Sequence, residues 1–183
     1  MNFHPLFRNH YFVQKSFIPS IEAKRLGRLY KDYMEQSNFG NDEQVELCRA
    51  SSDFFPFWQI LVDKNLEIGN LLGKKVMPSY TYSRMYLNGA ELVPHTDIEC
   101  CELDVSIHMD GDKPWPIWLD TPNGPASVTL ESGDALFYLG NKTVHWREPY
   151  DGDWYVNAFL FYVFSDGPNR HLLFDITKLA SRN

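Results

Sequence analysis

The sequence predicts a mainly β protein of the sandwich, barrel or jelly-roll type, with helices on its N-terminal side. The first observation behind this prediction is a change near residue 75, where helical periodicity gives way to short apolar segments separated by turn residues. The second is the regular spacing of seven or eight such segments up to residue 164, which is typical of a double-layered or closed β structure. The chain has 183 residues, enough for one core, so we expect a single domain over 1–183.

Two helices are expected in the N-terminal part, residues 1–74. The first occupies about 21–36, with Ser20 as its N-cap and apolar residues at helical spacing. The second runs over about 56–72 and ends at Gly73, because glycine readily takes the left-handed conformation of a helix C-cap. Both helices are expected to brace the β region.

The β core is expected at residues 75–165, followed by a C-terminal tail at 166–183. Turn signals such as Asn88-Gly89 separate its apolar segments. The expected strands are 80–87, 101–109, 115–119, 126–130, 134–139, 143–147 and 156–164.

Composition limits the function classes. The formal net charge is −7, from 17 Lys and Arg against 24 Asp and Glu, so the summed field repels phosphate backbones and nucleic acid is not an expected partner. We see neither a run of 18 apolar residues nor a signal peptide, and expect no membrane partner. The three cysteines, Cys48, Cys100 and Cys101, do not form a disulfide framework. A cytoplasmic location fits.

The short motif H-T-D at 95–97 and a later V-H-W at 144–146 raise the question of a metal site. On an extended segment His95 and Asp97 leave from the same face, and His145 could join them from a distant strand. Two histidines and one carboxylate leave open positions on an octahedral ion, the arrangement of non-haem Fe(II) oxygenases. Zinc could bind the same atoms, and three unrelated polar residues near strands are the plain alternative.

Three longer motifs make the sequence resemble a known family. They are Y-S-R-M-Y-L-N-G-A-E-L-V-P-H-T-D at 82–97, E-S-G-D-A-L-F-Y at 131–138 and V-H-W-R-E-P at 144–149. In combination they resemble the 2-oxoglutarate- and Fe(II)-dependent dioxygenases, most of all the prolyl 4-hydroxylase-like group, over about residues 78–164. The resemblance implies a double-stranded β-helix, a cupin-like jelly roll with the N-terminal helices packed on it. It also implies Fe(II) bound by His95, Asp97 and His145.

The same resemblance implies a pocket for 2-oxoglutarate that is lined by Tyr86. Strand alternation turns Arg84 toward the same interior, and His108 falls where relatives place a second pocket residue, although a register shift of one would turn it outward. Relatives carry Arg or Lys shortly after the distal histidine, where this chain has D-W-Y-V-N at 153–157. Because a buried dicarboxylate needs a cation, Arg84 and Arg147 are the candidate partners, and each could instead be an ordinary salt-bridging arginine.

The activity that the resemblance implies is hydroxylation of an unactivated C–H bond, with release of succinate and CO2. Its cofactors are Fe(II) and 2-oxoglutarate, with ascorbate as a candidate reductant. Candidate substrates are a peptidyl proline, a free amino acid or another small metabolite, held by rim loops at 36–55 and 148–154. A cupin-like metal-binding module without turnover of 2-oxoglutarate is the alternative, and the missing cation favours it. A nucleic-acid demethylase would share the triad, but the acidic composition counts against it.

Overall fold

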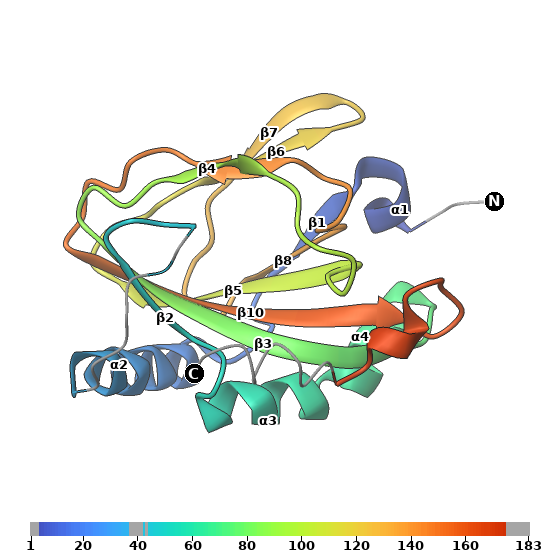
Figure 1. Cartoon of the computed structure of the whole chain (residues 1–183), viewed down its shortest axis with the longest axis horizontal. Helices are drawn as coiled ribbons and strands as arrows, with labels where there is room; N and C mark the ends of the chain where they lie inside the picture. The colour runs from blue at the N-terminus through green and yellow to red at the C-terminus, as the bar shows by residue number, and fades with distance from the viewer. Residues whose placement is uncertain (1–3, 37–41, 43, 175–183) are drawn as a thin grey trace.

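A computed structural model describes residues 4–36, 42 and 44–174 (Figure 1). Residues 37–41 and 43 of the expected rim loop, and residues 175–183 of the expected C-terminal tail, lie outside the described residues. Two β-sheets face each other, and helices cover the outer face of the larger one (Figure 1). The prediction of a mainly β protein with flanking helices is therefore confirmed.

The large sheet has six strands in the order β1-β8-β5-β10-β3-β2, and all its pairings are antiparallel. The last strand among the described residues, β10, lies in the middle of this sheet between β5 and β3. Its strands are β1 (Tyr11–Gln14), β2 (Cys48–Ser51), β3 (Val76–Leu87), β5 (Leu103–Gly111), β8 (Ala135–Tyr138) and β10 (Trp154–Phe164).

The small sheet has four antiparallel strands in the order β4-β9-β6-β7. A hairpin joins its last two strands, and Gly124 at that turn has a positive φ of 97°, which side chains disfavour. Its strands are β4 (Leu92–His95), β6 (Ile117–Thr121), β7 (Gly124–Val128) and β9 (His145–Arg147).

Helices α2 (Ser20–Gln36), α3 (Phe55–Asp63) and α4 (Asn65–Leu72) lie beneath the large sheet, on the face away from the small sheet (Figure 1). Helix α2 begins at Ser20, which was expected as the N-cap just before it, and, as predicted, Gly73 is the C-cap that ends α4, with a φ of 63°. The single helix expected over 56–72 is wrong in one respect, because it is divided at Lys64 into α3 and α4. The short helices are α1 (Pro5–Asn9) and η1 (Arg170–Leu172).

Alternate residues of the central strands serve two different interiors, as the two-residue period of a strand requires. One set, which includes Val105, Ala158 and Leu160, packs against the helices in the main hydrophobic core. The other set, which includes Tyr86, Tyr155 and Phe161, lies between the two sheets. The space between the sheets therefore receives aromatic and polar side chains, and it is there that the predicted site residues lie.

Two strands of the large sheet come from the N-terminal part, which the sequence had marked as helical. Strands β1 and β2 have four residues each and form the two edges of the sheet. Segments this short carry too little periodicity to be found from sequence. Among the described residues, no helix is both long and apolar enough to cross a membrane.

Candidate metal and cosubstrate site

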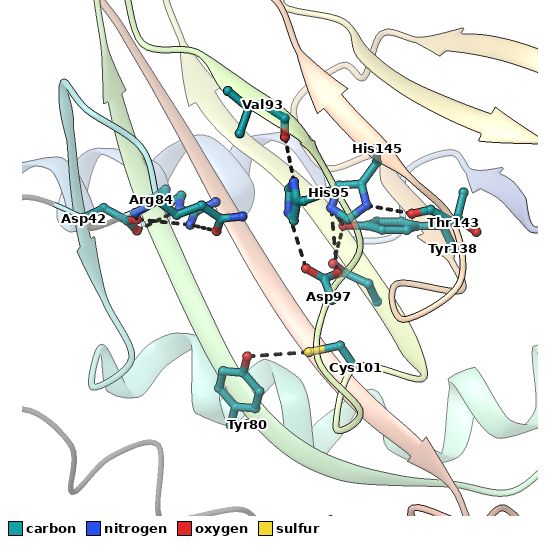
Figure 2. Close-up of polar contacts among 12 residues, drawn as sticks. Asp42, Tyr80, Arg84, Val93, His95, Asp97, Cys101, Tyr138, Thr143 and His145 are labelled. Carbon is teal, nitrogen blue, oxygen red and sulfur yellow. Dashed lines mark hydrogen bonds and ion pairs between the residues drawn. The ribbon is translucent and has the colours of Figure 1, made fainter.

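The two predicted histidine ligands lie on neighbouring strands of the small sheet. Strands β4 and β9 pair antiparallel with His95 directly opposite His145, and their ring centroids are 4.3 Å apart. Opposed residues on paired strands project from the same face of a sheet. Asp97 follows β4 by two residues and returns toward both rings (Figure 2).

Both imidazoles are oriented by backbone carbonyls. His95 Nδ1 lies 2.8 Å from the carbonyl oxygen of Val93, and His145 Nδ1 lies 3.0 Å from that of Thr143 (Figure 2). A ring that donates its Nδ1 proton in this way leaves Nε2 as the metal-binding nitrogen. The carbonyls therefore select the tautomer that leaves Nε2 unprotonated on both rings. Both Nε2 atoms face Asp97.

The three side chains have the spacing of metal ligands. Asp97 Oδ1 lies 3.6 Å from His95 Nε2, and Oδ2 lies 3.8 Å from His145 Nε2. One ligand atom from each residue lies within 4.8 Å of the others, so a single ion can reach all three. The two carboxylate–imidazole separations are too long for hydrogen bonds and short enough for both atoms of each pair to stand about 2.0–2.2 Å from a shared ion.

The protonation state of His145 also suits a metal. Burial lowers the pKa of His145, and the opposing effect of the Asp97 carboxylate does not cancel this shift. A neutral imidazole is the form that binds metal. The side chains of His95 and Asp97 are 18% and 17% exposed, whereas that of His145 is 3% exposed. The metal site is therefore open to solvent on the side of His95 and Asp97.

A tyrosine and a carboxyl group that the sequence analysis did not single out lie behind His145. The Tyr138 hydroxyl is 3.4 Å from His145 Nε2 and donates a hydrogen bond to Asp104. Burial, reinforced by Asp97, raises the pKa of Asp104 well above its usual range. An acidic residue at an inward position of the apolar strand 101–109 is a signal that could have identified it.

Arg147 lies two residues beyond His145 on the same face of β9 and is 1% exposed. Its Nη1 donates to the carbonyl oxygen of Trp115 at 2.6 Å, and its guanidinium lies over the rings of Trp115 and Tyr155 at 4.6 and 5.1 Å. Its Nη2 has no hydrogen-bond partner, and Arg147 makes no ion pair with any carboxylate among the described residues. A fully buried cation is thus left without an anion.

Other buried polar groups without partners surround this guanidinium. The hydroxyls of Tyr86 and Tyr155 and Nδ1 of His108 have no hydrogen-bond partner within the described part of the chain. The His108 ring stacks on Tyr155 with centroids 4.3 Å apart, so its side chain points inward. Burial, followed by the charge of Arg147, lowers the pKa of His108 to about 4. This group, Arg147, Tyr86, Tyr155 and His108, is called the Arg147 cluster below.

Arg84 shares the interior but is already paired. It donates to Asp42 through Nε at 3.0 Å and Nη2 at 3.3 Å, and Nη2 also donates to Gln44 at 2.7 Å (Figure 2). The Tyr82 hydroxyl donates to the same Asp42 carboxylate. Burial opposes ionisation of Asp42, but Arg84 and Tyr82 outweigh it and lower the pKa of that carboxyl.

The structure brings His95, Asp97 and His145 together and places Tyr86, Arg84, His108 and Arg147 inside the same two-sheet interior. The tryptophans at 115, 118 and 146 do not form a common wall of this interior. Trp115 packs in the interior, whereas Trp118 and Trp146 stack on each other at 6.0 Å, opposite each other on β6 and β9 and half-buried.

Comparisons with known proteins agree with this architecture. No family model and no curated protein sequence matches the chain. Solved structures do match: a Pseudomonas putida prolyl-4-hydroxylase has a TM-score of 0.68 at 13% identity, covering 86% of this chain and 94% of that one. HygX from Streptomyces hygroscopicus, solved with nickel and 2-oxoglutarate, has a TM-score of 0.65 at 12% identity, covering 86% and 84%. The chain has the double-stranded β-helix fold.

A third double-stranded β-helix, the viral collagen prolyl hydroxylase of Paramecium bursaria Chlorella virus-1 in its 2-oxoglutarate complex, matches with a TM-score of 0.61 at 14% identity and covers 84% of this chain and 95% of that one. The similarity therefore spans most of each protein. The resemblance that the motifs indicated is confirmed for the fold, although the sequences have diverged widely.

Proposed function

We propose that the chain is an Fe(II)- and 2-oxoglutarate-dependent oxygenase that hydroxylates a C–H bond of a small-molecule or peptide substrate. The observation that carries the proposal is the convergence of His95, Asp97 and His145 on one point of a double-stranded β-helix. Two imidazoles and one carboxylate would hold Fe(II) and leave positions open for a cosubstrate and O2, whereas catalytic zinc usually keeps one open position.

In this proposal His95 and His145 bind the ion through Nε2, and the carbonyls of Val93 and Thr143 hold the rings in place. When bound together, a ferrous ion and 2-oxoglutarate supply oxidative decarboxylation by O2, which releases succinate and CO2 and delivers one oxygen atom to the substrate. The residues contribute fixed ligand geometry and a site closed on the side of His145.

The Arg147 cluster supports 2-oxoglutarate as the cosubstrate. A dicarboxylate that reaches the metal with one end needs a cation for the other end. Arg147 offers an unpaired guanidinium nitrogen, and Tyr86 and Tyr155 offer hydroxyls without partners. These donors fit a carboxylate, so we infer that Arg147 is the anchor, with the two tyrosines and His108 lining the pocket. Arg84 does not take this role, because Asp42 already neutralises it.

This assignment accounts for the missing cation after the distal histidine. Tyr155 lies in the segment 153–157, where relatives carry Arg or Lys, and the guanidinium of Arg147 lies 5.1 Å from its ring. A cation on β9 thus takes the place of a cation on β10. For the substrate, we keep a prolyl residue and a small metabolite as alternatives: two similar structures are prolyl hydroxylases, and HygX was also solved with hygromycin B.

The test is anaerobic addition of Fe(II) and 2-oxoglutarate to the purified protein, monitored by the weak visible charge-transfer absorbance of the chelate. We expect the band in the wild type and not in Asp97→Ala, with metal binding followed separately by calorimetry.

Metal binding without the band would contradict 2-oxoglutarate as cosubstrate and would favour the cupin-like binding module. Absence of metal binding by the wild type would contradict the whole proposal. Once a substrate is found, His145→Ala is expected to abolish turnover while the protein remains folded, because the ligands of a catalytic metal contribute little to the core.

A further inference from the structure

One loop contacts two of the three proposed metal ligands. It joins β8 to β9 through residues 139–144, and its Thr143 carbonyl orients His145. The carbonyl of Gly140 in the same loop accepts a hydrogen bond from the backbone N–H of Asp97 at 2.9 Å. The loop is closed on itself, because Thr143 N–H donates to the carbonyl of Leu139 at 2.8 Å. The positions of Asp97 and His145 are therefore set by one rigid turn.

Gly140 also touches the carboxylate of Asp97. A Cβ built at this glycine would lie 2.5 Å from Asp97 Oδ2 and 2.9 Å from the carbonyl oxygen of Cys101. Both distances are below ordinary van der Waals contact. The φ of Gly140 lies outside the left-handed region, so alanine could adopt the backbone conformation. The requirement for glycine is therefore one of space next to the carboxylate.

The oxygen that Gly140 faces is the one closest to His145. Asp97 Oδ2 lies 3.8 Å from His145 Nε2, and it is buried without a hydrogen-bond partner among the described residues. Because no hydrogen bond from a described residue fixes Asp97 Oδ2, the position of this oxygen depends on the packing around it. A side chain at residue 140 would push it away from the point where the three ligands meet.

We propose that Gly140 is a positioning residue for the metal site, because its missing side chain leaves the space that the Asp97 carboxylate needs to reach a shared ion with His145. The inference rests on the proposed metal triad and adds to it a residue that would not itself bind the ion. Residues that orient metal ligands typically change metal affinity by about 10–100-fold when altered.

The experiment is calorimetric titration of the metal-free protein with Mn(II), comparing the wild type with Gly140→Ala. We expect the affinity of Gly140→Ala to fall by about 10–100-fold. Lys142→Ala is the matched control, because it alters an exposed side chain of the same loop. It should bind Mn(II) as the wild type does. Equal affinity of Gly140→Ala and the wild type would overturn the inference. Failure of the wild type to bind any metal would instead overturn the proposed function.

A second comparison tests the inference even if Gly140→Ala folds poorly. In the Asp97→Ala background the carboxylate is gone, so Gly140→Ala should lower the melting temperature less there than in the wild-type background. The difference between the two shifts is a readout that general crowding at residue 140 would not produce. Equal shifts, or failure to fold in both backgrounds, would overturn the inference. The destabilising clash of the new side chain would then be with the Cys101 carbonyl and not with the Asp97 carboxylate.

Discussion

Arg84 and Arg147 are two arginines buried in the same interior, yet their surroundings are opposite. Arg84 on β3 meets the Asp42 carboxylate in a two-pronged ion pair. Arg147 on β9 meets a carbonyl and two aromatic rings, and no carboxylate among the described residues pairs with it. Burying an unpaired cation costs several kcal/mol. A protein that keeps one is expected to use it for an anion that arrives from outside, and this is the main reason for assigning the two arginines different roles.

The largest effect that tests this comparison is expected at Arg84. Arg84→Met should lower the free energy of unfolding by about 3–5 kcal/mol, because it leaves Asp42 buried without its cation. The measurement is chemical denaturation of the metal-free protein. Affinity for 2-oxoglutarate in the presence of Mn(II) should stay within about threefold of the wild type. A large loss of that affinity with unchanged stability would reverse the roles of the two arginines.

Arg147→Met should show the opposite pattern. Loss of the anchor is expected to weaken 2-oxoglutarate binding by about 3 kcal/mol, or about 100-fold, when measured calorimetrically with Mn(II) present. The metal-free protein should be at least as stable as the wild type, because an apolar side chain of similar length replaces an unpaired charge whose burial is costly. Unchanged 2-oxoglutarate affinity would contradict the role of Arg147 as the anchor of the far carboxylate.

The lowered pKa of His108 predicts how the free energy of unfolding depends on pH. Its pKa is about 4 in the folded protein against an ordinary value of 6.5, so the unfolded chain binds more protons between these values. Stability is therefore complete above pH 6.5 and is lost as the pH falls toward 4. The expected contribution is about 2 kcal/mol between pH 7.5 and 5. Denaturation of the wild type and His108→Gln at both pH values measures it, and equal losses in the two proteins would contradict the prediction.

The smallest expected effect tests directly whether the role of Arg147 is to supply a cation for 2-oxoglutarate. In an Arg147→Met background, Tyr155→Lys returns a cation to the segment where relatives carry one. We expect it to recover about 1–2 kcal/mol of 2-oxoglutarate binding, measured by the same calorimetry. Tyr155→Phe in that background is the control, and it should recover nothing because it adds no charge. Equal binding by the lysine and phenylalanine variants would show that the pocket needs no cation there.

The sequence was sufficient where its signals were local or tightly spaced. His95 and Asp97 are two residues apart on an extended segment, and this spacing alone predicts a shared face. Gly73 marked a helix end through its left-handed C-cap conformation, and Ser20 marked the start of a helix to within one residue. The motifs around residues 82–97 and 131–149 added the fold, which the similarity to solved structures confirms.

What the sequence could not predict depends on contacts between distant segments. Arg84 and Arg147 both face the interior by alternation, and only the position of Asp42 beside Arg84 distinguishes them. The link from Asp104 through Tyr138 to His145 requires the pairing of β5 with β8. Likewise, nothing local to Gly140 indicates that its neighbour is the carboxylate of Asp97.

The strand order of the large sheet has a consequence for biosynthesis. Its central strand, β10, is made after the five other described strands of the sheet, and the edge strand β1 pairs with residues 135–138. During translation, therefore, the nascent chain carries β3 and β5 without the strand that joins them. Such long-range pairing slows folding and leaves strand edges open in the meantime. Until Phe164 has been made, β3 and β5 therefore each keep an unpaired edge to which another chain could add.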